Sequence, residues 1–101
     1  MYEIVVHEAA EEELNAAAVF YESRESDLGN EFLEELSQGF SRIGEHPLSY
    51  SVHFDDYRRY LMNRFPYSVV YRIEQDAILV FAVAHLRRRP GYWIDRNHIT
   101  R

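Results

Sequence analysis

Apolar residues recur at helical intervals in the first half of the chain. Between residues 8 and 25 they fall at i, i+4, i+7, i+8 and i+11, the positions of Ala10, Leu14, Ala17, Ala18 and Tyr21. This period predicts an amphipathic helix from Glu8 to about Ser23 or Glu25. The glutamates at 11, 12 and 13 lie mostly on the other side of that helix, and we expect all three to face solvent.

A second helical period follows a short polar break. Its apolar side is formed by Phe32, Leu33, Leu36, Phe40 and Ile43. Ser26 or Asp27 is suited to cap the first turn, and Pro47 ends the helix after His46. Because the break between the two segments is short, the pattern predicts a helical hairpin.

The other segments have strand character. Residues 2–7 are rich in β-branched side chains, and three further strands are predicted at 58–63, 67–74 and 77–86. Short turns join the last three strands, which therefore form an antiparallel meander. The connection from 48 to 56 has no clear period. The last strand is apolar on both sides, which places it at the centre of the sheet and under the helices.

These elements predict an α+β fold in the order β-α-α-β-β-β, with an N-terminal helical hairpin packed on a mainly antiparallel four-stranded sheet. A chain of 101 residues has room for one core, so we expect a single domain over 1–101, with a tail after about residue 93. No apolar run approaches the roughly 20 residues that span a bilayer, and the start lacks the basic region of a signal peptide. We therefore expect a cytoplasmic protein without a membrane partner.

Composition narrows the chemistry. The sequence contains no cysteine, which excludes disulfides and thiolate nucleophiles. His7, His46, His53 and His98 occur in dissimilar contexts, without the i, i+4 spacing of a helical metal site. We therefore expect neither a metal ion nor another cofactor.

The net charge of -6 conceals an uneven distribution. Residues 1–45 contain twelve acidic residues and two arginines, a balance of -10, whereas residues 46–101 contain five acidic residues and nine arginines, a balance of +4. All eleven basic residues are arginine. An acidic protein of this kind can still present a basic face to an anionic partner.

Strand alternation places some of these arginines beside a histidine. If the last strand is regular, His85 and Arg87 share a face with Leu79, Phe81 and Val83. A meander also brings its arginines, among them those at 58, 59 and 64 on and just after its first strand, towards a common edge or face of the sheet.

The segments PYSVVYRIE (66–74) and AVAHLRRRPGYW (82–93), with the HP pair (46–47) that closes the second helix, carry a resemblance. Together with the order of elements, they are similar to the RelE/ParE superfamily of bacterial type II toxins, from Tyr2 to about Trp93. The resemblance implies a toxin bound by a cognate antitoxin protein. Its activity would be either inhibition of DNA gyrase, as in ParE-like members, or ribosome-dependent cleavage of messenger RNA, as in RelE-like members.

A metal-independent nuclease needs groups that transfer protons and cations that neutralise the phosphorane. On that interpretation His85, Arg87 and Tyr92 are the catalytic residues. The candidate target- or phosphate-binding residues, on either interpretation, are Arg58, Arg59, Arg64, Arg88, Arg89 and Trp93.

Several departures favour the ParE-like alternative. RelE-like nucleases carry an arginine directly after the tyrosine that opens the third strand, whereas this chain has Ser68 after Tyr67. The chain also lacks lysine as a base, and its acidic balance is unusual for a protein that enters a ribosomal RNA site. A gyrase inhibitor needs a binding surface rather than catalytic residues. A stabilisation or dimerisation module without toxicity is a third alternative.

Structural roles compete with these assignments. His85 can hydrogen-bond the backbone, residues 87–89 can be solvated, and Tyr92 and Trp93 can tie down a C-terminal tail. An arginine-rich rim beside an apolar groove also suits an acidic amphipathic helix or an added strand. We therefore expect the antitoxin to contact the sheet and the helical hairpin, in a hetero-oligomer, with a homodimer as a further assembly.

Overall fold

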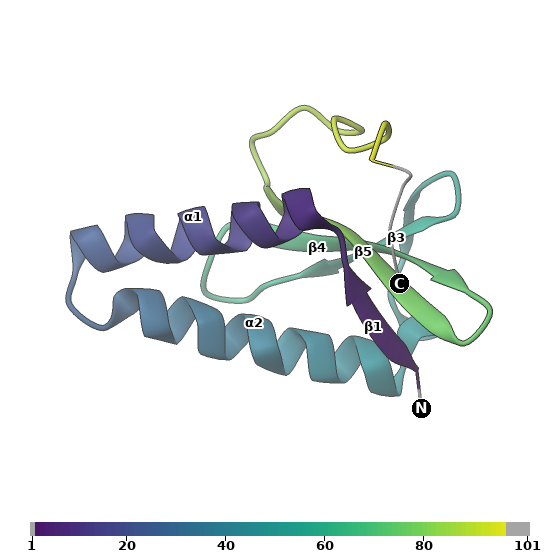
Figure 1. The fold of residues 1–101 in the computed structure, drawn as a ribbon, viewed down its shortest axis with the longest axis horizontal. Helices are drawn as coiled ribbons and strands as arrows, with labels where there is room; N and C mark the ends of the chain where they lie inside the picture. The colour runs from purple at the N-terminus through teal and green to yellow at the C-terminus, as the bar shows by residue number, and fades with distance from the viewer. Residues whose placement is uncertain (1, 97–101) are drawn as a thin grey trace.

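The computed structural model describes residues 2–96 and has the α+β architecture predicted from the sequence (Figure 1). The elements are β1 (Glu3–Val6), α1 (Glu8–Arg24), α2 (Leu28–Glu45), the short 3₁₀ helix η1 (Pro47–Ser49), β2 (Val52–Phe54), β3 (Tyr57–Leu61), β4 (Tyr67–Glu74) and β5 (Ala77–His85). No helix in the described part of the chain is long and apolar enough to cross a membrane.

Both helices of the hairpin are capped at their N-termini by side chains that accept backbone N–H groups. His7 precedes α1, and its Nδ1 accepts the N–H of Ala9 at 2.9 Å. Asp27 precedes α2 with a left-handed φ of 75°, and its side chain does not cap the helix. Instead, the Glu22 carboxylate of α1 accepts the N–H groups of Asp27 and Gly29, at 2.9 and 3.0 Å. One helix therefore caps the next.

The cap at His7 gives a direct test of helix stability. We expect His7→Ala to lower the free energy of unfolding by about 1 kcal/mol, because it removes the acceptor of an otherwise unpaired helical N–H. His7→Asn should retain most of the stability, since asparagine is a good capping residue. Urea denaturation of both variants checks this, and equal losses would mean that the ring contributes by packing rather than capping.

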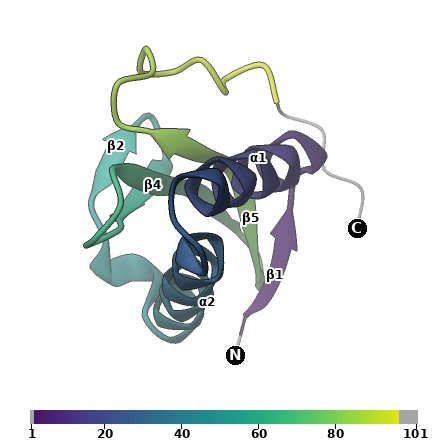
Figure 2. The same cartoon turned by 90° about the vertical axis from the view of Figure 1, so that its left-hand side faces the viewer.

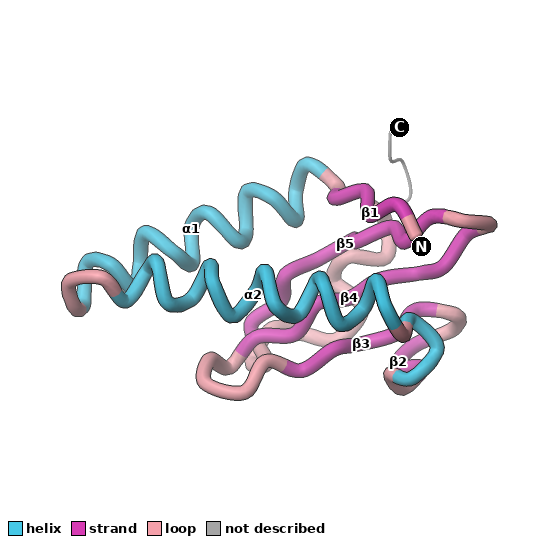
Figure 3. Tube along the Cα trace, turned by 90° about the horizontal axis from the view of Figure 1, so that it is seen from below, coloured by secondary structure: helices cyan, strands magenta, loops and turns pink. Residues whose placement is uncertain are grey.

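The sheet has five strands in the order β1-β5-β4-β3-β2, visible in Figure 3, rather than the four that were predicted. β1 runs parallel to β5, and the other neighbours are antiparallel. The additional strand is β2, which has three residues and lies at an edge. Val52 and Phe54 are exposed while His53 is partly buried, so the apolar residues point outward, and a run of three residues is too short for its alternation to predict a strand.

The two helices cover one face of the sheet (Figure 2). The core beneath them contains Phe32, Leu36, Ile43, Phe65, Val69, Tyr71, Ile78, Val80 and Val83, among others. The Tyr71 hydroxyl donates to the Pro47 carbonyl at 2.5 Å, and burial raises the pKa of Tyr71 to about 12. β5 is buried from Ala77 to Ala84 and lies between β1 and β4, so the prediction that it has a neighbour on each side is confirmed.

A β-bulge in β5 overturns the predicted alternation. Val70 of β4 pairs with Ala82, but Tyr71 pairs with Val80, so Phe81 is an extra residue. Phe81 and Ala82 consequently belong to the same core cluster, on the face away from the helices. Beyond the bulge the faces exchange, and Val83 joins Ile78 and Val80 rather than Leu79 and Phe81.

Candidate functional site

The segment after β5 folds back over the sheet as far as Arg96. Leu86 N–H donates to the Pro66 carbonyl at 2.9 Å, and successive turns carry the chain to Arg96. Trp93 and Ile94 pack in the second core cluster, with Tyr57, Phe81 and other residues of the face that the helices leave uncovered. Residues 97–101, including His98, lie outside the described residues.

Glu13 holds this segment in place, contrary to the prediction that it faces solvent. One Glu13 oxygen accepts the N–H of Val83 at 3.0 Å, and the other accepts the Tyr92 hydroxyl at 2.6 Å. Arg96 donates to Glu13 at 2.9 Å and to the Phe81 carbonyl at 3.2 Å. Glu13 and Arg96 thus provide hydrogen-bond partners for backbone groups of β5 beyond Val80, where the pairing with β1 ends. Burial, followed by the bond to Glu13, raises the pKa of Tyr92 well above its usual range.

Several predicted site residues meet at the end of β5. A cavity of about 40 Å³, here called the C-terminal cavity, is lined by His53, Arg59, Ser68, Ala84, His85, Leu86, Arg88, Pro90, Tyr92 and Trp93. It therefore brings together Arg59, His85, Arg88, Tyr92 and Trp93 of the residues singled out from the sequence. β2, β3, β4, β5 and the segment that follows β5 each contribute to its walls.

His85 occupies the last position of β5 and has a structural role there. Its Nδ1 accepts the N–H of Arg87 at 3.0 Å, which stabilises the turn that follows. Its ring stands edge to face with that of Tyr67, at 5.1 Å between centroids. Regular alternation had predicted that Arg87 continues the strand and lies beside His85. The chain instead turns after His85, so Arg87 is not part of the strand.

Trp93 and Arg58 are both engaged within the fold. Trp93 is 2% exposed and packs in the second core cluster, and it also forms part of the wall of the C-terminal cavity. Arg58 donates to the carbonyl oxygens of Tyr50 and Leu48, at 2.6 and 3.3 Å, and anchors the connection after η1. Arg88 stacks on the Tyr92 ring at 3.9 Å, whereas Arg87 and Arg89 are exposed and do not line the cavity.

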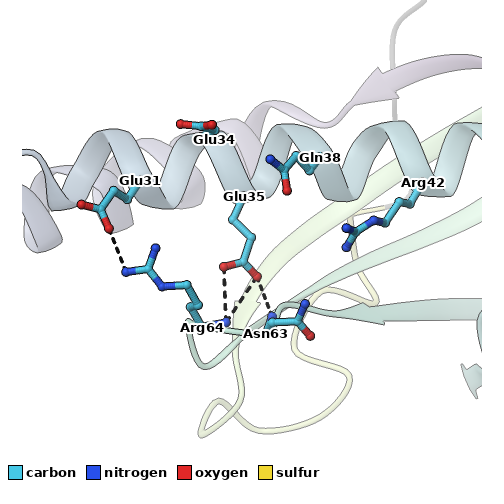
Figure 4. A pocket seen from close by; sticks show the side chains of 7 residues that line it. All are labelled: Glu31, Glu34, Glu35, Gln38, Arg42, Asn63 and Arg64. Carbon is cyan, nitrogen blue, oxygen red and sulfur yellow. Dashed lines mark hydrogen bonds and ion pairs between the residues drawn. The ribbon is translucent and has the colours of Figure 1, made fainter.

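Arg64 belongs to a different groove, between α2 and the turn that joins β3 to β4 (Figure 4). It forms an ion pair with Glu31 at 2.8 Å, and Glu35 accepts the backbone N–H groups of Asn63 and Arg64. The groove has a volume of about 330 Å³ and is lined by Glu31, Glu34, Glu35, Gln38, Arg42, Asn63 and Arg64. Its acidic lining separates Arg64 from the other candidate phosphate-binding residues.

Sequence reasoning missed His53, Glu13 and Arg96 as parts of this region. His53 lies in the segment without a period, and burial followed by the charge of Arg59 lowers its pKa. Glu13 and Arg96 are 83 positions apart and form an ion pair at 2.9 Å. The one available signal for Glu13 was its place on the side of the helix that faces the edge of the sheet. The bulge that directs the Val83 N–H at Glu13 has no signature in the sequence.

A solved structure shares this arrangement of a helical hairpin on a sheet. It is titled "Chromosomal ParDE TA system from P. aeruginosa", and it matches with a TM-score of 0.62 at 13% identity. The match covers 84% of this chain and 96% of that chain. At this identity the likeness shows the fold alone, a helical hairpin on one face of a mainly antiparallel sheet.

The sequence itself assigns the family. The family model described as the ParE toxin of the type II toxin-antitoxin system, parDE, matches residues 4–90. The chain therefore belongs to the ParE toxin family, and it is a toxin of a type II toxin–antitoxin system. Comparison with curated proteins finds no match.

Proposed function

We propose that this toxin acts in the cytoplasm by binding and inhibiting a cellular target such as DNA gyrase, and that a cognate antitoxin neutralises it. The proposal rests on one observation: Tyr92 and His85, the candidate proton-transfer residues, are both hydrogen-bonded to other groups of the fold. The Tyr92 hydroxyl donates to Glu13, and the raised pKa of Tyr92 keeps it protonated. His85 Nδ1 is occupied by the Arg87 N–H. Both side chains support the local fold, which favours a binding protein over a nuclease.

The surface beside α1 supports an antitoxin of acidic, amphipathic character. Val19 and Phe20 of α1 are 70% and 48% exposed. Phe20 lines a groove of about 310 Å³ with Ala16, Tyr67, Val83 and Arg88, among other residues. An apolar side chain of the partner can enter this groove while an acidic side chain reaches Arg88. Such a partner contacts both the helical hairpin and the end of the sheet.

The purified toxin separates the two candidate targets in parallel reactions. We expect gyrase-catalysed supercoiling to fall when the toxin is added at a small molar excess over gyrase, while messenger RNA stays intact in a ribosome-containing translation reaction. Addition of the antitoxin encoded beside the toxin should restore supercoiling. His85→Ala serves as the variant that tests proton transfer.

The opposite pattern would overturn the proposal. Codon-positioned cuts in messenger RNA that disappear with His85→Ala would make the protein a RelE-like endonuclease. Unaffected supercoiling together with intact messages would remove both targets and leave a module without either activity.

A further inference from the structure

The described residues that line the C-terminal cavity include several hydrogen-bond donors and cationic groups, and none of these described residues is acidic. Arg59 and Arg88 are permanently charged, and Ser68 supplies a hydroxyl. His53 and His85 supply two imidazoles. Within residues 2–96 neither Arg59 nor Arg88 forms an ion pair. The positive charge at this cavity is therefore not neutralised by the described part of the chain.

Trp93 adds an independent observation. Its side chain is 2% exposed and lines the cavity, and its indole Nε1 is the buried side-chain atom without a hydrogen-bond partner among the described residues. An indole N–H can only donate, and leaving it unpaired in the interior costs about 1 to 3 kcal/mol. An acceptor within hydrogen-bond reach of this N–H would remove the cost.

The electrostatic potential in the cavity also favours a bound anion. Burial, followed by the charge of Arg59, lowers the pKa of His53, so this ring stays neutral near pH 7. An anion beside His53 and Arg59 would oppose that effect and stabilise the protonated ring. The cavity therefore offers fixed charge from its arginines, and a bound anion would shift the pKa of His53 upward.

Size restricts the class of anion. A water molecule needs roughly 10 to 15 Å³ of cavity volume. The C-terminal cavity has about 40 Å³ and thus holds about three atoms of that size. A carboxylate group has three heavy atoms, whereas a phosphate group has five. The apolar wall of Ala84, Leu86 and Pro90 can contact the methylene groups that carry a side-chain carboxylate.

We propose that the C-terminal cavity binds one carboxylate group, supplied by an aspartate or glutamate of a protein partner. Arg59 and Arg88 bind the charge, and the Trp93 indole donates to one carboxylate oxygen. The site is independent of the gyrase assignment, because it requires only a partner with an accessible acidic side chain.

The single tryptophan of the chain makes the test specific. The full-length protein, labelled with ¹⁵N, is titrated with sodium formate and with sodium acetate, while sodium chloride keeps the ionic strength constant. The indole N–H cross-peak should shift downfield and saturate, with a dissociation constant on the order of 10 mM for a single ion pair with few other contacts. Sodium chloride without formate should leave the peak unchanged.

Matched arginine variants identify the binding groups. Arg59→Gln and Arg88→Gln should each weaken formate binding by about tenfold, since each removes a charge-assisted hydrogen bond. Arg89→Gln is the control, because Arg89 is exposed and does not line the cavity. Arg88→Lys keeps the charge and provides a milder variant if a glutamine variant does not fold.

Three results would overturn the proposal. The indole peak could stay unchanged in formate and acetate, which would leave water as the acceptor. All three glutamine variants could lose affinity equally, which would indicate general charge screening. Inorganic phosphate could bind more tightly than formate with the same dependence on Arg59 and Arg88, which would replace the carboxylate with a phosphate ligand.

Discussion

Replacement of Glu13 by alanine is expected to lower the free energy of unfolding by about 2 to 4 kcal/mol and to release the segment after β5. The carboxylate accepts from Val83, Tyr92 and Arg96, and the Glu13 side chain is 16% exposed. Its removal leaves the Arg96 guanidinium, 21% exposed, without its acidic partner. The loss exceeds that of a surface ion pair, because several donors lose one acceptor together.

Two measurements check this prediction. Urea denaturation gives the loss of stability, and Trp93 fluorescence should shift to longer wavelength at low urea if the segment detaches first. Glu12→Ala is the matched control, since Glu12 is exposed on the same turn of α1 and makes none of these contacts. Equal stability of the two variants would show that the Glu13 contacts add no net free energy.

We expect Gly29→Ala to destabilise the protein by about 2 to 3 kcal/mol, although alanine favours helices. A Cβ at Gly29 would lie 2.5 Å from the carbonyl oxygen of Ala18 and 3.0 Å from the Glu22 side chain. The nearest atom belongs to the backbone of α1, so the two helices must separate to make room. The change would also disturb the bond from Gly29 N–H to Glu22.

Gly44→Ala is the control for this prediction. A Cβ at Gly44 would meet the Ile4 side chain at 3.5 Å, which is ordinary van der Waals contact. Gly44 lies in the last turns of the same helix, and we expect alanine there to leave the stability unchanged or to raise it by up to about 1 kcal/mol. Thermal unfolding of both variants tests the difference in sign, and two equally stable variants would contradict the close approach at Gly29.

The elements that the sequence predicted well are those whose burial repeats with one period. α1 and α2 were placed to within about two residues, because each buries one stripe of apolar side chains along its length. β4 alternates regularly as well, since Tyr67, Val69, Tyr71 and Ile73 all contact the helix-covered core. β2 was missed because it pairs with β3 through its backbone and exposes its apolar side chains.

The candidate site was predicted less completely. The region near His85 and Tyr92 was identified from the composition of the segment after β5, and Arg59, Arg88 and Trp93 do meet these residues in one cavity. Arg58 and Arg64 were grouped with them by strand alternation, but each is engaged by other partners. Whether the grouped residues bind a target stays a prediction.

The sequence by itself determined the family, the order of the main elements and the uneven distribution of charge, because these depend on motifs, on periodicity and on composition within contiguous segments. The tertiary structure decided which side chains meet. One extra residue in β5 exchanges the faces of the strand beyond Phe81 and aims Val83 N–H at Glu13. Register, bulges and ion pairs between residues 83 positions apart depend on contacts across the fold, and no local pattern encodes them.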